Sequence, residues 1–235
     1  MNNIFGIILS GGTGSRMNSS LPKQFLQVNE IPLIAHSAKV FKEWGFIKSL
    51  IIVANESYIE ETERALYDIL EQNDRIVTGG DSRHASTLCG IDSVVTDEND
   101  ILIFHDAARP FVSEKELHEL CDIALKWGSA TLAEKVNETI VETLEDRVES
   151  ILNRDKIHTI KTPQALHTSL LKLLDKVEME EEPTDLCSWV SHIGVKPGIV
   201  PSNPFNIKIT KESDLEIANA YYPLFERWKH SFQRV

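Results

Sequence analysis

The sequence predicts an α/β fold, in which a mostly parallel sheet carries helices on both faces. Short apolar runs alternate along the chain with segments whose apolar residues recur at helical spacing, which is typical of such sheets. Polar and glycine-rich loops directly follow several apolar runs, and open α/β sheets bind ligands at those strand ends. The chain has 235 residues, enough for a complete core, and we expect a single domain over residues 1–235.

The first half of the chain contains most of the expected elements. Three short apolar runs predict buried strands, at residues 4–9, 50–54 and 101–104, and residues 75–77 predict a further short strand. Two segments between them have helical spacing, at residues 32–44 and 58–70. A capping box at Ser113–Glu116 predicts the start of a third helix, because each of these two side chains can bond the other residue's backbone N–H.

The second half departs from this alternation. Residues 139–144 and 148–152 flank an acidic turn, which predicts a β-hairpin. A two-stranded hairpin is barely stable alone, so we expect an arm at about residues 138–154 that packs on another subunit in a two-fold homodimer. A helix at residues 169–177, a solvated acidic loop at 178–182 and a strand at 206–209 follow. Leu224, Phe225, Trp228 and Phe232 share one helical face, which we expect to pack on the protein's own body.

A glycine loop follows the first apolar run, with the sequence Leu-Ser-Gly-Gly-Thr-Gly-Ser-Arg at residues 9–16. Glycines let backbone N–H groups approach phosphate oxygens, and Arg16 and Lys23 add two cations nearby. A P-loop needs Lys and then Ser or Thr after its last glycine, but Ser15 follows Gly14 here. A dinucleotide fingerprint needs a small residue where Met17 stands. The loop therefore predicts another kind of polyphosphate site, with an ordinary glycine turn as the alternative.

The composition excludes several classes of protein. The net charge of −12 argues against a general nucleic-acid surface, because such surfaces are basic. We find no apolar run long enough to span a bilayer and no signal peptide, so we expect no membrane partner. The three cysteines are far apart and near no histidine cluster, which indicates reduced thiols rather than disulfides or a zinc site. We therefore expect a cytoplasmic protein.

Further polar segments fall where a ligand site is expected, and they form motifs. After the glycine loop come Leu-Pro-Lys-Gln-Phe at 21–25, Gly-Gly-Asp-Ser-Arg at 79–83, His-Asp-Ala-Ala-Arg-Pro at 105–110, Thr-Pro-Gln at 162–164, Thr-Asp at 184–185 and Asn-Ile-Lys-Ile-Thr at 206–210. In this order, from Ile4 to about Tyr222, the chain resembles the cytidylyltransferases that make CDP-polyols from 2-C-methyl-D-erythritol 4-phosphate or ribitol 5-phosphate. The resemblance implies a Rossmann-like nucleotidyltransferase fold with a β-hairpin arm.

The resemblance also implies a role for each matching residue. The catalytic cations near the CTP phosphates would be Arg16, Lys23 and Lys208. The nucleotide would be bound by Ser10, Gly11, Gly12, Gly14, Gly80, Asp81 and Ser86. The polyol phosphate would be bound by Asp106, Arg109, Thr162 and, from the neighbouring subunit's arm, Thr139 and Arg154. Taken singly, Asp106 and Arg109 also fit a salt bridge, and Thr139 and Thr162 ordinary turn or hairpin positions.

The implied reaction transfers CMP from CTP to the polyol phosphate and releases pyrophosphate. Two anions must meet, so positioning and charge neutralisation would dominate catalysis. A Mg²⁺ ion bridging the CTP phosphates is expected, with Asp106 as its protein contact. The motif at 105–110 resembles the methylerythritol phosphate branch, whereas Thr139–Glu142, Leu21–Lys23 and the glycine loop resemble the ribitol phosphate branch. We expect 2-C-methyl-D-erythritol 4-phosphate, an isoprenoid precursor, as the substrate, with ribitol 5-phosphate as the alternative. The sequence also admits a non-catalytic nucleotide-binding module or a sugar-1-phosphate nucleotidyltransferase, because one fold can serve several functions.

Overall fold

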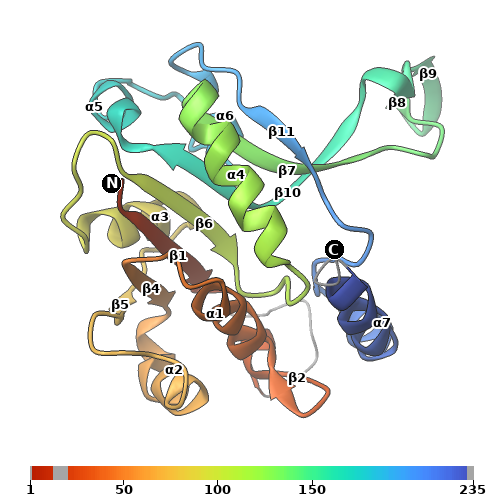
Figure 1. Cartoon of the computed structure of the whole chain (residues 1–235). Helices are drawn as coiled ribbons and strands as arrows, with labels where there is room; N and C mark the ends of the chain where they lie inside the picture. The colour runs from red at the N-terminus through yellow and green to blue at the C-terminus, as the bar shows by residue number, and fades with distance from the viewer. Residues whose placement is uncertain (1, 13–20, 232–235) are drawn as a thin grey trace.

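The centre of the structure, a computed structural model that describes residues 2–12 and 21–231, is a seven-stranded mixed sheet (Figure 1). Its strand order is β11-β7-β10-β6-β1-β4-β5. The strands are β1 (Ile4–Ser10), β4 (Ser49–Ala54), β5 (Arg75–Thr78), β6 (Ile101–Asp106), β7 (Ser129–Lys135), β10 (His158–His167) and β11 (Gly198–Pro201). Strands β6, β1, β4 and β5 are parallel, and β10 runs antiparallel to both β6 and β7. The predicted α/β fold is confirmed.

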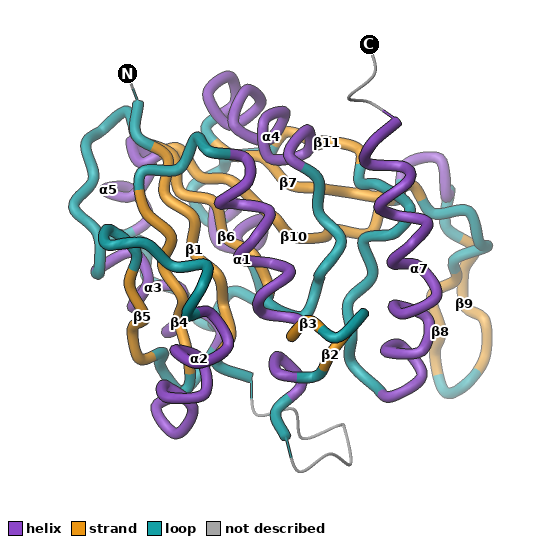
Figure 2. Tube along the Cα trace, turned by 60° about the horizontal axis from the view of Figure 1, so that its bottom comes forward, coloured by secondary structure: helices purple, strands orange, loops and turns teal. Residues whose placement is uncertain are grey.

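Helices cover both faces of this sheet, as predicted. Side chains alternate along a strand, so Ile7 and Ile8 of β1 belong to separate core clusters. The face of Ile8 packs on α1 (Leu33–Trp44), α2 (Ile59–Leu66) and α4 (Glu114–Trp127), and Figure 2 shows α1 and α4 crossing it. The face of Ile7 packs on α3 (Arg83–Asp92), α5 (Leu171–Leu174) and α6 (Leu186–Ser191). Because β6, β1, β4 and β5 are parallel, their carboxyl ends lie at one edge of the sheet, where ligands bind in open α/β folds.

Local sequence explains where the two longest sheet-covering helices begin and end. The predicted capping box is present at the start of α4, with Ser113 and Glu116 each bonding the other's backbone. Gly128 ends α4 and Gly45 ends α1, both in the left-handed conformation that glycine adopts without strain. Pro32 precedes α1, in which the predicted apolar face is buried against the sheet.

The predicted hairpin forms an arm that projects from the body (Figure 1). Strands β8 (Val141–Leu144) and β9 (Arg147–Ile151) pair antiparallel in a two-stranded sheet of their own. The arm has apolar side chains in solvent, because Leu144 and Val148 are each 63% exposed and Ile151 is 72% exposed. A second small sheet, β2 (Gln27–Val28) and β3 (Ile31–Pro32), precedes α1.

Three of the predicted elements are wrong or too long. Residues 206–209 form an irregular segment rather than a strand, and its Ile209 N–H bonds the Ala108 carbonyl at 2.9 Å instead of a strand partner. The helix predicted at 169–177 is reduced to a 3₁₀ turn, Thr168–Leu170, and the short α5. The helix predicted at 58–70 ends at Leu66 in the structure.

The last helix, α7 (Glu212–Ser231), packs on the body as expected. Phe225 is buried beside Phe111, and Trp228 packs against Phe205. Leu224, however, is 41% exposed, so its inclusion in the buried face was wrong, and Phe232 lies outside the described residues. Within residues 2–12 and 21–231, no helix has the length and apolar character needed to cross a bilayer. Cys89, Cys121 and Cys187 are free thiols.

Candidate active site

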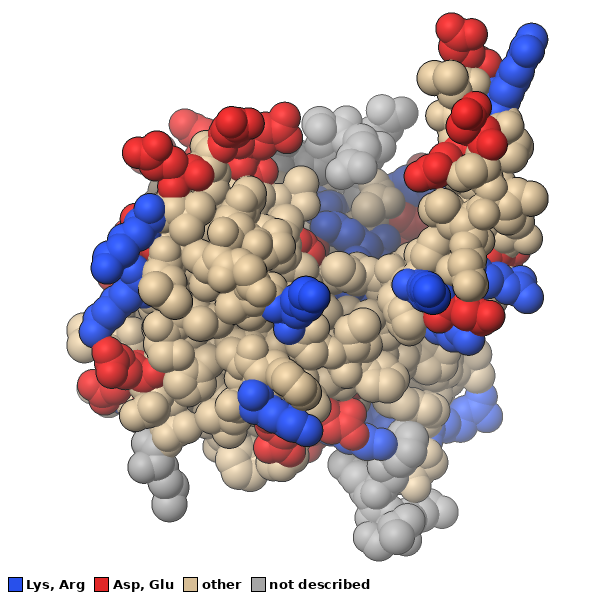
Figure 3. Space-filling model, turned by 90° about the horizontal axis from the view of Figure 1, so that it is seen from above, with Lys and Arg blue, Asp and Glu red and all other residues tan. Residues whose placement is uncertain are grey.

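A cleft of about 730 Å³ opens at the carboxyl ends of β1, β4, β5 and β6. Its described walls are residues 9–12, 23–24, 55–57, 78–83, 86, 106–108 and 208. They include every nucleotide-binding residue that the sequence predicts except Gly14. Gly14 and Arg16 lie outside the described residues. Figure 3 shows basic side chains inside a hollow between the body and the projecting arm.

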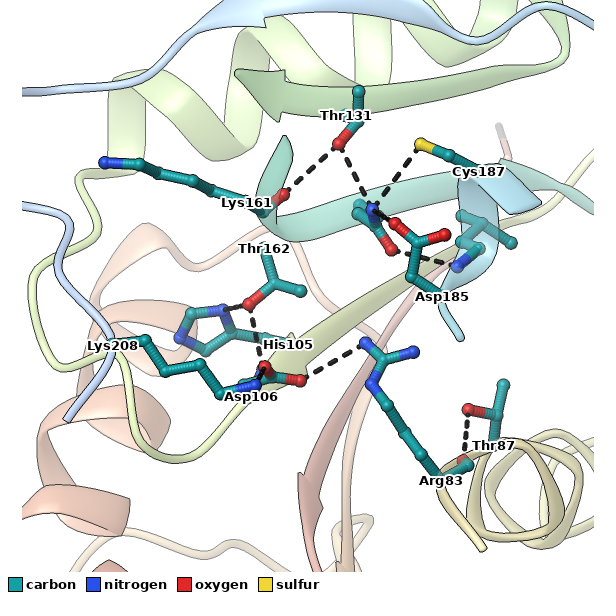
Figure 4. A network of polar contacts seen from close by, with 12 residues as sticks. Arg83, Thr87, His105, Asp106, Thr131, Lys161, Thr162, Asp185, Cys187 and Lys208 are labelled. Atoms are coloured by element: carbon teal, nitrogen blue, oxygen red, sulfur yellow. Dashed lines mark hydrogen bonds and ion pairs between the residues drawn. The ribbon is translucent and has the colours of Figure 1, made fainter. Parts of the chain in front are cut away.

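Asp106, the last residue of β6, binds two cations at one edge of the cleft (Figure 4). Lys208 Nζ lies 2.6 Å from Asp106 Oδ2, and Arg83 Nη2 lies 3.2 Å from Oδ1. Burial of the carboxyl raises its pKa, but Arg83 and Lys208 outweigh burial and hold the pKa of Asp106 well below the ordinary value. The carboxylate is therefore charged, and it keeps two cations together that would otherwise repel each other.

Arg109 lies three residues further along the turn that follows β6 and is mostly buried. Its Nη1 group makes only long contacts with Asn206, 3.4 Å to the carbonyl and 3.5 Å to Oδ1. Its buried Nε atom has no hydrogen-bond partner in the described part of the chain. Burial lowers the pKa of Arg109, whereas the nearby Asp106 carboxylate raises it. Arg109 is not among the described residues that line the cleft, although its charge helps to lower the pKa of Asp106.

Thr162 reaches the site from a strand that the sequence did not reveal. It was expected at the carboxyl end of a parallel strand, but it lies within β10, at the register shift between Lys161 and Gln164. Its Oγ1 atom accepts a hydrogen bond from the Asp106 N–H at 3.1 Å and lies 3.2 Å from His105 Nδ1. The antiparallel strand β10 thus brings a hydroxyl group directly to the turn that carries Asp106.

The nucleotide side of the cleft is built from close backbone packing. A Cβ on Gly80 would lie 2.5 Å from Ala85 Cβ, and one on Gly12 would lie 3.7 Å from Lys23 Cε. Ser86 Oγ donates to the Gly80 carbonyl at 3.2 Å, which fixes the loop after β5 against α3. Ser10 is 3% exposed, and its hydroxyl has no partner within the described residues. Gly80 therefore has no room for a side chain against α3, whereas a methyl group at Gly12 would make only an ordinary contact.

Thr139 and Arg154 do not join the other site residues within this chain. Both are exposed at the base of the arm, and neither lines the cleft. Arg154 Nη1 donates to the Asn137 carbonyl at 2.8 Å, which holds the arginine along the arm. In the single chain, both residues are therefore available to a neighbouring molecule rather than to their own cleft.

Three residues at the site have no role that the sequence alone assigns. Arg83 is one of many cations in the sequence, although the Gly-Gly-Asp-Ser-Arg motif contains it. His105 contacts both Thr162 and the Arg109 carbonyl, and Asn206 Nδ2 donates to the Thr162 carbonyl at 3.0 Å. Each of the three residues lies within one of the sequence motifs. Membership of a motif was therefore the sequence feature that could have identified them as site residues.

Comparisons with known proteins identify the family of the chain. The profile of the 2-C-methyl-D-erythritol 4-phosphate cytidylyltransferase (IspD) family matches residues 4–223. An enzyme of that name from Leptospira borgpetersenii serovar Hardjo-bovis is 44% identical over 224 residues, 95% of each chain. Another, from Halalkalibacterium halodurans, is 34% identical and covers 94% of this chain and 97% of its own.

The fold has a close structural counterpart. The crystal structure of 4-diphosphocytidyl-2C-methyl-D-erythritol synthase from Anaerococcus prevotii matches with a TM-score of 0.83 at 24% identity, over 94% of this chain and 96% of that one. At this identity the likeness supports the fold alone. The family match and the Leptospira relative show more: the chain belongs to the 2-C-methyl-D-erythritol 4-phosphate cytidylyltransferase family.

Proposed function

We propose that this chain transfers CMP from CTP to 2-C-methyl-D-erythritol 4-phosphate, giving 4-diphosphocytidyl-2C-methyl-D-erythritol and pyrophosphate. Family membership supports the reaction class and this acceptor over ribitol 5-phosphate. The observation that carries the proposal is the group of cations around Asp106, where Lys208 and Arg83 bind the carboxylate and Arg109 lies nearby with an unused donor. Of this group, Asp106, Lys208 and Arg83 line the same cleft as Gly11 and Gly12 of the glycine loop.

The chemistry matches what these residues supply. A phosphate oxygen of the acceptor attacks the α-phosphorus of CTP, one P–O bond forms, and the bond to pyrophosphate breaks. The acceptor phosphate is already an anionic nucleophile, so the step needs no general base. Lys23 and Lys208, together with Arg16 from the sequence motif, would neutralise the charge that gathers as the two anions meet.

The acceptor would bind at the Asp106 end of the cleft. Arg109 and Lys208 are donors that suit its phosphate, whereas the Asp106 carboxylate is an acceptor that suits its hydroxyl groups. Thr162, hydrogen bonded to the Asp106 backbone, would add a hydroxyl beside them. The nucleotide would occupy the rest of the cleft, with cytosine and ribose against Ser10, Gly80, Asp81 and Ser86, and the phosphates against the loop of Gly11, Gly12 and Gly14.

Asp106 is also suited to contact a Mg²⁺ ion. Its carboxylate stays charged, it faces the cleft, and each oxygen has a lone pair beyond the one used by Lys208 or Arg83. Mg²⁺ prefers oxygen ligands and commonly binds through one or two carboxylates together with substrate phosphates. When bound with CTP, the ion would neutralise phosphate charge.

We further propose that the arm makes a homodimer in which Thr139 and Arg154 complete the neighbour's acceptor site. The exposed apolar side chains of the arm support this, because Leu144, Val148 and Ile151 have no cover in the single chain. The placement of Thr139 and Arg154 outside their own cleft is consistent with it. A cytoplasmic location stays a prediction.

Pyrophosphate release from CTP tests the proposed function. We expect turnover with 2-C-methyl-D-erythritol 4-phosphate and a kcat/KM at least about 100-fold lower with ribitol 5-phosphate. A site built to hydrogen-bond the hydroxyl groups of one polyol leaves polar groups unpaired when another polyol binds. Better turnover of ribitol 5-phosphate would reassign the substrate. CTP binding without pyrophosphate release with either acceptor would instead favour a non-catalytic module, and turnover of a sugar 1-phosphate would indicate the related sugar nucleotidyltransferases.

A further inference from the structure

We infer that His105 is a positioning residue for the acceptor end of the site: its two ring nitrogens hold the Arg109 carbonyl and the Thr162 hydroxyl in place. The inference rests on the proposed function, because Arg109 and Thr162 are placed there as acceptor-binding groups. His105 itself is fully buried behind Asp106 and does not line the cleft. Its effect on the reaction must therefore pass through the groups that it holds.

The hydrogen bonds fix which nitrogen carries the proton. His105 Nε2 lies 2.9 Å from the Arg109 carbonyl oxygen, which can only accept, so Nε2 is the N–H donor. In the neutral ring, Nδ1 is then an acceptor, and the Thr162 hydroxyl donates to it across 3.2 Å (Figure 4). This leaves the Thr162 oxygen to accept the Asp106 N–H at 3.1 Å. One imidazole therefore orders a chain of bonds from the Asp106 backbone to the Arg109 backbone.

Ser37 and Ile209 also hold this turn, and both bond its backbone carbonyls. Ser37 of α1 donates to the Ala107 carbonyl at 3.2 Å and contacts that of Arg109 at 3.4 Å. Ile209 N–H bonds the Ala108 carbonyl at 2.9 Å. Among these residues, His105 alone also orients a side chain of the proposed site, that of Thr162. This link makes His105 specific to the acceptor end rather than to the fold in general.

The two hydrogen bonds can be removed separately. His105→Asn keeps an amide oxygen near the position of Nδ1, so it preserves the acceptor for Thr162 and loses the donor to Arg109. His105→Gln keeps an amide nitrogen near Nε2, so it does the reverse. His105→Phe keeps the ring beside Phe41 but loses both bonds. A buried side chain far from the turn is the matched control: Ser129→Ala removes a hydrogen bond of 3.0 Å to the Ala165 carbonyl.

Steady-state kinetics with both substrates, together with thermal unfolding, test the inference. We expect His105→Phe to raise KM for the acceptor about tenfold or more, with KM for CTP changed less than about twofold, because both hydrogen bonds position acceptor groups. The Asn and Gln variants should each fall between wild type and Phe. Ser129→Ala should lower the unfolding temperature without this KM split.

The results distinguish failure of the proposed function from failure of the role proposed for His105. If wild type does not turn over 2-C-methyl-D-erythritol 4-phosphate, the proposed function fails. If wild type is active but His105→Phe raises both KM values equally, or neither, the role of His105 is structural only and the inference is overturned. Should the Phe variant fail to fold, the Asn and Gln variants decide the question by the same KM split, since each retains one of the two bonds.

Discussion

Lys208 Nζ lies 2.6 Å from Asp106 Oδ2, although 102 residues separate the two along the chain. The irregular segment that carries Lys208 is anchored beside the turn after β6 by the bond from Ile209 N–H to the Ala108 carbonyl. Both side chains line the cleft, and that of Lys208 is the more exposed, at 37% against 12% for Asp106. Asp106 thus holds a cation where a substrate phosphate can reach it.

Replacing Lys208 tests whether this cation acts on the reaction. Lys208→Ala should lower kcat by about two to three orders of magnitude, the range for loss of one preorganised stabilising group. Lys211→Ala is the matched control, because this exposed lysine lies three residues further along and outside the cleft. Pyrophosphate release at saturating CTP and acceptor measures the effect. A Lys208→Ala enzyme with normal kcat and only a raised KM would leave Lys208 a binding residue.

The parts of the fold that the sequence predicted have an unambiguous pattern. Strands β1, β4 and β6 are continuous apolar runs, so their burial was evident. Strand β7 begins Ser129-Ala130-Thr131, and β10 contains Lys161, Thr162 and Pro163, so neither has an apolar run. Both are strands because they pair with neighbours in the sheet, and no local pattern reports such pairing.

The candidate site, like the fold, could be predicted from the sequence only in part. Motifs locate Asp106, Lys208 and the glycine loop because each is a short continuous segment with a distinctive composition. The Arg83 ion pair and the Thr162 hydrogen bond join residues 23 and 56 positions away from Asp106, and only the folded chain shows them. Residues 206–209 alternate polar and apolar side chains, which predicted a strand, but Ile209 packs in the cluster around α7. Packing on α7 explains the alternation without a sheet.

The nucleotide side of the cleft predicts which base is accepted. The loop after β5 lies tightly on α3, with the Cβ position of Gly80 2.5 Å from Ala85 and Ser86 mostly buried. We propose that the base lies against this loop, and membership of the cytidylyltransferase family makes cytosine the expected base, so we expect strong preference for CTP over ATP and GTP. UTP should be the best of the poor substrates, because pocket size cannot exclude another pyrimidine. Relative kcat/KM values for the four nucleotides check this, and equal turnover of ATP and CTP would contradict the assignment of the pocket.

His36 predicts how stability depends on pH. It lies on α1 with Nε2 2.8 Å from the Val28 carbonyl and its ring 5.5 Å from that of Tyr222 on α7. Burial lowers the pKa of His36 below its ordinary value of 6.5, and Lys39 lowers it further, against opposing effects of the Val28 carbonyl and Glu226. The unfolded chain therefore binds the proton more readily than the folded protein does. The contribution of neutral His36 to the free energy of unfolding should be fully present above pH 6.5. It should be lost as the pH falls through the lower pKa that His36 has in the folded protein.

Urea unfolding of wild type and His36→Gln at pH 7.5 and pH 5 measures this contribution. Glutamine keeps a donor for the Val28 carbonyl but does not titrate, so the variant should lose less stability between the two pH values than wild type does. Other histidines titrate equally in both proteins, and the difference between the proteins isolates His36. Identical losses would show that His36 does not contribute.

The last prediction concerns a site shared between two chains. Lys23 lines its own cleft, whereas Arg154 lies on the arm outside it. If the arm completes the neighbour's site, Lys23→Ala and Arg154→Ala should each nearly inactivate a homodimer. In a mixed dimer, one site then collects both substitutions and the other collects neither. Mixing the two variants should therefore restore activity towards half of wild type per mixed dimer.

A second arm residue controls for general damage to the hairpin. Arg147 is exposed on β9, and Arg147→Ala should leave the homodimer active, because the substitution changes the arm without touching Arg154. Subunit exchange between differently tagged chains must be verified by co-purification before activity is read. If mixed dimers form and no activity returns, Arg154 acts on its own chain, and the two-chain site is wrong. Recovery that rises with the fraction of mixed dimers would place Arg154 and Lys23 in one site from opposite subunits.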